Sequence, residues 1–350
     1  MATRWANQGR KIFDVSLALL VLASTSATLV LLGSVTYCRG RAVDTEERFF
    51  SSKYRPTIDE ATAACPVEYA LRTQDANDVV FLGDSTCRTG LDPARFERAT
   101  GLVAYNLGSL RGIGPAGFVI TAKAYLLHHA KPRAIVLCVS PVCFEDDATR
   151  IGGPLQKQFV ENYGAEVSEL VPLFDRISYF CKRGVRTVWK PTEAREPEVV
   201  DTDVRDTPLR GFKSESYHTL QRKTLEKRGF FDLPGAHGPP RGIGKAEPTL
   251  IRDEWTQGIR RLARICAEAG VPLVVQFAPI SAELARARDL APLETWSREL
   301  ELSHPNTQVA RPIVLIYHPT LLWDSIHLNS AGVDKFVELV ARNVRAALSR

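Results

Sequence analysis

The sequence lacks the patterns that mark several large classes of protein. Its 350 residues contain no internal repeat and no low-complexity segment, which argues against a repeat array. They also contain no basic run interleaved with aromatic residues, and the formal net charge is only +5. Nucleic acid is therefore not an expected partner. The charged and apolar fractions, 24% and 45%, are ordinary for a globular protein.

The cysteines also lack a pattern. Paired spacing of the kind that metal ligands show is absent from all seven, which stand at positions 38, 65, 87, 138, 143, 181 and 266. We therefore expect no metal centre and no cofactor. An odd number cannot all pair within one chain, and Cys138 lies in an apolar run where a buried, reduced thiol is expected. The cysteines do not indicate whether the chain lies in an oxidising or a reducing compartment.

Charged residues are absent from residues 15–38. This stretch is about 24 residues long, against roughly 20 needed to cross a bilayer and about 7–15 in the apolar region of a signal peptide. We therefore expect residues 1–44 to form a short tail and one transmembrane signal-anchor. A cleaved signal is the alternative. A lipoprotein cleavage box at residues 35–38 is disfavoured by the bulky Tyr37 before Cys38.

The orientation of this segment is inferred from its form. A short tail before an apolar run is the usual form of an uncleaved signal-anchor, which places the N-terminus inside and the rest of the chain outside the cytoplasm. The positive-inside rule does not support this orientation, because the basic residues after the span outnumber those before it. Those that follow are Arg39, Arg41, Arg48, Lys53 and Arg55.

From residue 78 onward, apolar runs of strand length alternate with helical patterns. This alternation predicts an α/β domain over residues 78–350 with a mostly parallel sheet, preceded by a polar connector at 45–77 with a short helix near 58–64. The expected strands are 79–82, 102–107, 134–140, 271–277 and 312–317. The expected helices begin near residues 92, 114, 252, 281 and 329, and those from 281 and 329 end near 302 and 348.

The alternation is interrupted at about residues 144–248, a stretch rich in proline, glycine and charge. We interpret this stretch as an insertion. It either covers the edge of the sheet where the strands end, as a substrate-binding cap would, or forms an irregular surface excursion with its own small core.

Two short motifs carry chemistry at opposite ends of the domain. Gly83-Asp84-Ser85 directly follows an apolar strand, and ligands of open α/β sheets bind where strands end. Asp324-Ser325-Ile326-His327 stands near the C-terminus. A serine hydroxyl becomes a good nucleophile when a base takes its proton, and His327 is the candidate base. Asp324 would hold the other ring nitrogen, so we predict a triad of Ser85, His327 and Asp324.

Each motif alone is weak evidence. Gly-Asp-Ser is a common turn, and Asp-x-x-His also occurs beside surface histidines, so the interpretation rests on their combination. Asp84 is expected to shape the turn rather than to perform chemistry. Arg88 and Arg111 either meet an anionic substrate or are solvated charges. Structural or exposed positions are expected for three histidines, His128, His129 and His318.

These motifs, with Asn106-Leu107-Gly108 between them, resemble the conserved blocks of the SGNH (GDSL-type) hydrolase superfamily. The resemblance covers residues 78–145 and 250–348, and Leu-Asn-Ser-Ala-Gly at 328–332 continues the last block in the family's manner. It implies a three-layer α/β/α fold with a mostly parallel, flavodoxin-like sheet. It also implies that Ser85 is the nucleophile and that the backbone N–H groups of Ser85 and Gly108 belong to the oxyanion hole.

The third block departs from the family's Gly-x-Asn, whose asparagine gives an oxyanion donor. Here the strand ends in Val139-Ser140-Pro141-Val142, so Ser140 is the candidate substitute. Losing one such donor costs about 10²–10³ in rate in other enzymes, which predicts slow hydrolysis unless Ser140 or a residue of the insertion substitutes. A Ser-Pro at this place is similar to membrane-associated members that move acyl groups on envelope polymers, such as alginate O-acetylation proteins and the teichoic-acid D-alanylation protein.

Together, the resemblance and the uncharged stretch imply a membrane-anchored serine esterase or O-acyltransferase. Its substrate would be an acylated glycan or lipid of the cell envelope, and envelope acylation proteins are candidate partners. Two alternatives stay open. One is a noncatalytic glycan-binding or assembly protein on an SGNH scaffold, which the missing asparagine favours and the retained serine, histidine and aspartate oppose. The other is a membrane-tethered structural protein whose α/β domain mediates contacts.

Overall fold

A parallel five-stranded sheet organises the part of the chain that the computed structural model describes, which is residues 58–72, 75–145, 153–164, 224–233, 247–248 and 251–349. Its strands are β1 (Val79–Gly83), β2 (Ala104–Gly108), β3 (Ala134–Val139), β5 (Leu273–Phe277) and β8 (Thr307–Val309). They lie in the order β2-β1-β3-β5-β8, and all neighbours are parallel. In chain order this is 2-1-3-4-5, the doubly wound order of flavodoxin-like sheets. The predicted α/β class with a parallel sheet is confirmed.

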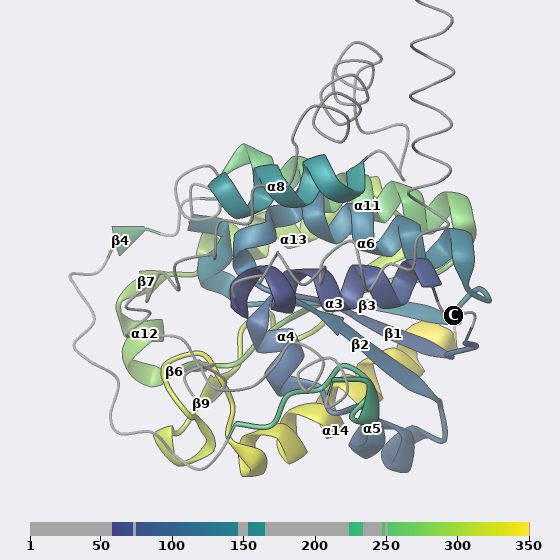
Figure 1. Ribbon diagram of the computed structural model, residues 1–350. Helices are drawn as coiled ribbons and strands as arrows, with labels where there is room; N and C mark the ends of the chain where they lie inside the picture. Colours follow the sequence, from purple (N-terminus) through teal and green to yellow (C-terminus); the bar gives the residue numbers. More distant parts are fainter. Residues whose placement is uncertain are drawn as a thin grey trace, which may run out of the picture. The chain divides into compact units, whose positions relative to one another are not determined.

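Helices cover both faces of this sheet (Figure 1). The helices and 3₁₀ turns, in chain order, are α3 (Ile58–Arg72), α4 (Ser85–Gly90), α5 (Pro93–Thr100), η1 (Arg111–Ile113), α6 (Gly114–His128), η2 (Pro141–Glu145), α8 (Gly153–Tyr163), α11 (Asp253–Ala269), α12 (Ala282–Arg286), α13 (Ala291–Ser303), η5 (Pro319–Leu321) and α14 (Ser330–Leu348). Figure 1 shows α3, α6 and α11 on one face and α5 and α14 on the other. Every residue of β1, β2 and β3 is buried, as the uninterrupted apolar runs of β1 and β3 require.

The two faces have separate aromatic cores. On the face of α11, the ring of Phe144 lies 5.6 Å from that of Trp255, 4.9 Å from Trp296 and 5.5 Å from Phe277. On the face of α14, a second cluster of buried residues includes Phe81, Phe96 and Phe336, with the Phe81 and Phe96 rings 5.0 Å apart. The strands that lead to the candidate site are therefore held on both sides.

The C-terminal part of the sheet differs from the sequence-based prediction. The fifth strand of the sheet is β8, and the prediction that residues 312–317 form the last strand is wrong. Within that range only β9 (Ile316–Tyr317) is a strand, and it pairs with β6 (Ile280–Ser281) outside the main sheet. A second small sheet pairs β4 (Glu247–Pro248) with β7 (Arg288–Asp289). The helix predicted from 281 to 302 is divided into α12 and α13, because Pro292 fits only the first turn of a helix.

Residues 1–44, where the signal-anchor is predicted, lie outside the described residues. Within the described ranges, no helix is both long enough and apolar enough to cross a bilayer. The helix predicted near 58–64 extends to Arg72 as α3.

Most of the predicted insertion at 144–248 also lies outside the described residues. Of its described pieces, α8 packs against α6, η1 and α3. Residues 224–233 pack against the edge strand β2, where the backbone N–H of Asn106 donates to the carbonyl oxygen of Arg228 at 2.9 Å. This piece of the insertion therefore covers one edge of the sheet, which would otherwise present unpaired backbone groups.

Candidate active site

Ser85 lies at the point where the order of the strands reverses. Strand β1 pairs with β2 on one side and β3 on the other, and crevices form beyond the carboxyl end of such a strand. A side chain at Gly83 would place its Cβ 1.7 Å from the carbonyl oxygen of Cys138, so only glycine fits where the strand ends. The chain then turns at Asp84, and Ser85 is the first residue of α4.

Asp84 holds this turn in place. Its buried carboxylate accepts hydrogen bonds from the backbone N–H and the hydroxyl of Thr86, at 2.9 and 2.5 Å. Its other oxygen accepts from the backbone N–H of Ser140 at 3.0 Å and the thiol of Cys143 at 2.8 Å. The carboxylate therefore joins the ends of β1 and β3, which matches the turn-shaping role expected for Asp84.

The three residues of the predicted triad are brought together from the two ends of the domain. The Ser85 Oγ lies 2.9 Å from the His327 Nε2, and the His327 Nδ1 lies 2.7 Å from the Asp324 Oδ2. A carboxylate only accepts, so Nδ1 carries the proton of the neutral ring. Nε2 then has a free lone pair facing the Ser85 hydroxyl, which is the arrangement that general-base catalysis requires.

Asp324 fixes both the loop and the ring. While its Oδ2 faces the imidazole, its Oδ1 accepts from the backbone N–H groups of Ile326 and His327, at 2.8 and 2.7 Å. Burial acts to raise the pKa of this carboxyl. The hydrogen bonds to His327 and to the two N–H groups, with the charge of the imidazolium, outweigh burial and lower the pKa below its ordinary value. The carboxylate therefore stays ionised at neutral pH.

The loop that carries His327 is tied down on both sides. The carbonyl oxygen of Ser325 accepts from the backbone N–H of Ser281 at 2.9 Å, and that of His327 accepts from Trp323 at 2.7 Å. The Trp323 ring meets the imidazole edge-on, with ring centres 6.4 Å apart. His327 is 5% exposed, so few orientations are open to its ring.

The residues predicted for the oxyanion hole differ in whether their backbone N–H groups already have hydrogen-bond acceptors. The N–H of Gly108 donates to the Asn106 Oδ1 at 2.7 Å, and the N–H of Ser140 donates to Asp84, so both are engaged. The Ser140 hydroxyl is buried and has no hydrogen-bond partner among the described residues. The N–H of Ser85 opens α4 and has no partner within that helix by position. Of the predicted backbone donors, it is the one that remains for an oxyanion.

The structure also shows the surroundings of three residues whose burial the sequence did not decide, Arg88, Arg111 and His129. The interpretation of Arg88 as a solvated charge is wrong, because it is 2% exposed and donates to the Thr62 carbonyl oxygen and the Thr224 hydroxyl, both at 3.2 Å. Arg111 is half-buried in η1. His129 is buried against the Tyr125 ring, with ring centres 4.1 Å apart, and is structural.

Sequence reasoning missed two residues that hold the site's frame. The motif gives Asn106 no role of its own, yet its side chain donates to the carbonyl oxygens of Cys87, within α4, and Leu91, the residue that follows α4. Arg95 joins α5 to the start of α14 and belongs to no motif, so no pattern pointed to it.

Comparison with known proteins adds no family. No protein-family model matches this chain, and no curated protein matches its sequence.

Proposed function

We propose that this chain is an SGNH-type serine esterase or O-acyltransferase, anchored in a membrane with its catalytic domain outside the cytoplasm. Its substrate would be an acyl ester of a cell-envelope glycan or lipid, handled with envelope acylation proteins as partners. The observation that carries the catalytic part is the pair of contacts at 2.9 and 2.7 Å that connects Ser85, His327 and Asp324. The membrane and substrate parts rest on the uncharged stretch at 15–38 and on the family resemblance.

In the proposed reaction, the Ser85 Oγ bonds to the acyl carbonyl carbon while its proton passes to the His327 Nε2. The bond to the alcohol then breaks, and Nε2 returns the proton to the departing oxygen. This step leaves an acyl ester on Ser85. Water or a sugar hydroxyl next attacks that ester and gives its proton to Nε2, and the acyl group leaves Ser85, which regains its proton.

Asp324 supports both halves of this cycle. Its carboxylate keeps the proton of the neutral ring on Nδ1 and stabilises the imidazolium that forms when Nε2 takes a second proton. The backbone N–H of Ser85 donates to the developing oxyanion. With the N–H groups of Gly108 and Ser140 engaged elsewhere, this hole is weaker than one with three backbone donors, which favours slow hydrolysis and suits transfer to a sugar hydroxyl.

A second candidate is a noncatalytic glycan-binding or assembly protein on the same scaffold. Two observations favour it: the missing asparagine of the third block, and the hydrogen bonds that occupy the N–H groups of Gly108 and Ser140.

Labelling of the full-length chain with a serine-directed fluorophosphonate tests the proposal. The wild type should label and Ser85→Ala should not. The exposed Ser349, at the end of α14, gives a matched control, since Ser349→Ala should label as the wild type does. A wild type that does not label at any pH refutes the catalytic proposal and leaves the second candidate. With an acyl donor and a glycan acceptor, a transferase acylates the acceptor faster than it releases free acid.

A further inference from the structure

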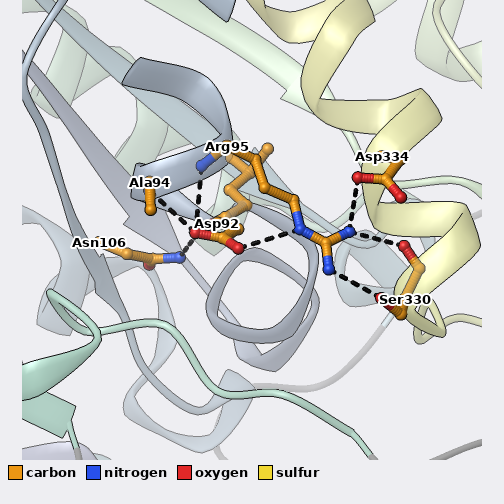
Figure 2. A network of polar contacts seen from close by, with 7 residues as sticks. Asp92, Ala94, Arg95, Asn106, Ser330 and Asp334 are labelled. Carbon is orange, nitrogen blue, oxygen red and sulfur yellow. Dashed lines mark hydrogen bonds and ion pairs between the residues drawn. The ribbon is translucent and has the colours of Figure 1, made fainter. Parts of the chain in front are cut away.

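Arg95 bridges two helices on the α14 face of the sheet. Its guanidinium donates to the carbonyl oxygen of Ser330 at 2.8 Å, to the Ser330 hydroxyl at 2.7 Å and to the Asp334 carboxylate at 2.7 Å. Its Nε pairs with Asp92, the N-cap of its own helix, at 3.1 Å. Figure 2 shows the side chain reaching from α5 to the first turn of α14. One guanidinium thus holds the beginnings of both helices together.

On the α5 side, this bridge leads to the proposed nucleophile. Helix α4 begins at Ser85 and ends at Gly90, and α5 begins only three residues later at Pro93. The Asn106 amide donates to the carbonyl oxygen of Leu91 in this connection at 2.7 Å. The path from Ser85 to Arg95 therefore runs through one short helix and a connection that is itself hydrogen-bonded to β2.

On the α14 side, the bridge leads to the proposed base. Ser330 follows His327 by three residues, and Asn329 between them is fixed at both ends of its amide. The Asn329 Oδ1 accepts from the N–H of Gly332 at 3.1 Å, and its Nδ2 donates to the carbonyl oxygen of Thr320 at 2.8 Å. A shift of the first turn of α14 would therefore be passed to the loop that carries His327.

Helix stability does not explain a cation at this position. The N-terminus of a helix carries partial positive charge, so a guanidinium there is unfavourable for α14 on its own. Asp92 and Asp334 offset that charge, but the Asp334 side chain is 65% exposed, and such ion pairs contribute little. The two contacts to Ser330 are directional and use the fork of the guanidinium, a geometry that lysine does not reproduce.

We propose that Arg95 is a positioning residue that sets the place of His327 relative to Ser85 by clamping α5 to the first turn of α14. The catalytic consequence rests on the proposed serine chemistry. A misplacement of about 1 Å at a reacting centre costs roughly 100-fold in rate, so a clamp on the 2.9 Å contact between Ser85 and His327 affects turnover without touching substrate.

The test compares Arg95→Ala with Arg345→Ala in the full-length chain. Arg345 offers a matched control, because it also joins α14 to α5 but does so far along both helices, where it donates to the carbonyl oxygen of Ala99. Hydrogen exchange is measured for the amides of residues 323–329, and fluorophosphonate labelling of Ser85 is measured across pH. Arg95→Ala should speed exchange in that loop and slow labelling, each by about 10-fold, while Arg345→Ala changes neither.

Arg95→Lys keeps the charge without the fork and should fall between Arg95→Ala and the wild type in both measurements. It also serves as the test variant if Arg95→Ala fails to fold. The proposal is overturned if the amides of residues 323–329 exchange at the same rate in the Arg95 variants as in Arg345→Ala. This holds whether those rates match the wild type or are raised above it. If the wild type does not label but the loop exchange responds as expected, the clamp holds and the proposed serine chemistry falls.

Discussion

Replacing Asp324 with asparagine changes the chemistry of the proposed triad while keeping its loop. The asparagine oxygen can still accept from the N–H groups of Ile326 and His327, which Asp324 accepts at 2.8 and 2.7 Å. Its amide NH₂ then takes the place of the Oδ2, 2.7 Å from the His327 Nδ1. Because that group donates, Nδ1 must accept, and the proton of the neutral ring moves to Nε2.

The expected loss is large because Nε2 is the atom that faces Ser85. A protonated Nε2, 2.9 Å from the Ser85 Oγ, has no lone pair for the serine proton. The same change in a serine protease lowers kcat by about 10⁴, which corresponds to about 5 kcal/mol of transition-state stabilisation. We expect fluorophosphonate labelling of Asp324→Asn to be slower by roughly 10³–10⁴. Its melting temperature should fall only modestly, because the loop keeps its backbone contacts and loses only the contribution of the ionised carboxylate.

The assay compares labelling rates and melting temperatures for the wild type, Asp324→Asn and Asp253→Asn. Asp253 is a suitable control because it is an exposed aspartate in the first turn of α11, on the other face of the sheet. Labelling of Asp324→Asn within 10-fold of the wild type, with the fold intact, would refute the assignment of Asp324 to the ring of His327.

Three further predictions concern stability. Phe144→Ala should lower the free energy of unfolding by about 3–5 kcal/mol in denaturant titrations, because it empties the centre of an aromatic cluster. Gly229→Ala should destabilise more than Gly101→Ala. Both glycines have positive φ, but a Cβ at 229 would lie 1.8 Å from the carbonyl oxygen of Asn106, whereas nothing lies within 4 Å of one at 101. The lowered pKa of Asp324 stabilises the fold at pH values above the carboxyl's unfolded pKa, and this contribution is lost as the pH falls through its folded pKa. In acid titrations, the free energy of unfolding of Asp324→Asn should therefore fall less steeply with decreasing pH than that of the wild type.

The central part of the fold could be predicted because its strands are mostly apolar runs of five or six residues. Strands β1, β3 and β5 are buried on both faces, and a run such as residues 134–139 fits a strand covered by helices on both sides. The edge strand β8 has only three residues, and its pattern is no stronger than that of the nearby apolar run at 312–317. Which of the two joins the sheet is decided by tertiary pairing with β5, and no local pattern reports it.

The candidate triad could be predicted from sequence because two motifs contain all of its members. One holds Ser85, and the other holds Asp324 and His327. Arg88 shows the limit of that reasoning. An arginine is usually exposed, and its burial depends on Thr62 from α3 and Thr224 from the insertion, which lie far from it in the chain. The engagement of the Gly108 N–H by Asn106 is similarly invisible in the motif, because both residues belong to the same block and neither spacing nor composition tells which way an amide points.

The contacts of the proposed triad are complete, whereas the oxyanion has few backbone donors, and this difference separates the two candidate functions. Attack by Ser85 needs His327 and Asp324, whose contacts are complete, whereas turnover of an ester also needs donors for the oxyanion. Freeing the N–H of Ser140 would take a donor away from the buried Asp84 carboxylate, whose negative charge also opposes an oxyanion beside it. A fluorophosphonate reports on the first attack by serine and not on turnover of the resulting adduct, so rapid labelling with slow ester turnover fits an acyltransferase or slow esterase. The noncatalytic candidate requires that labelling fail as well.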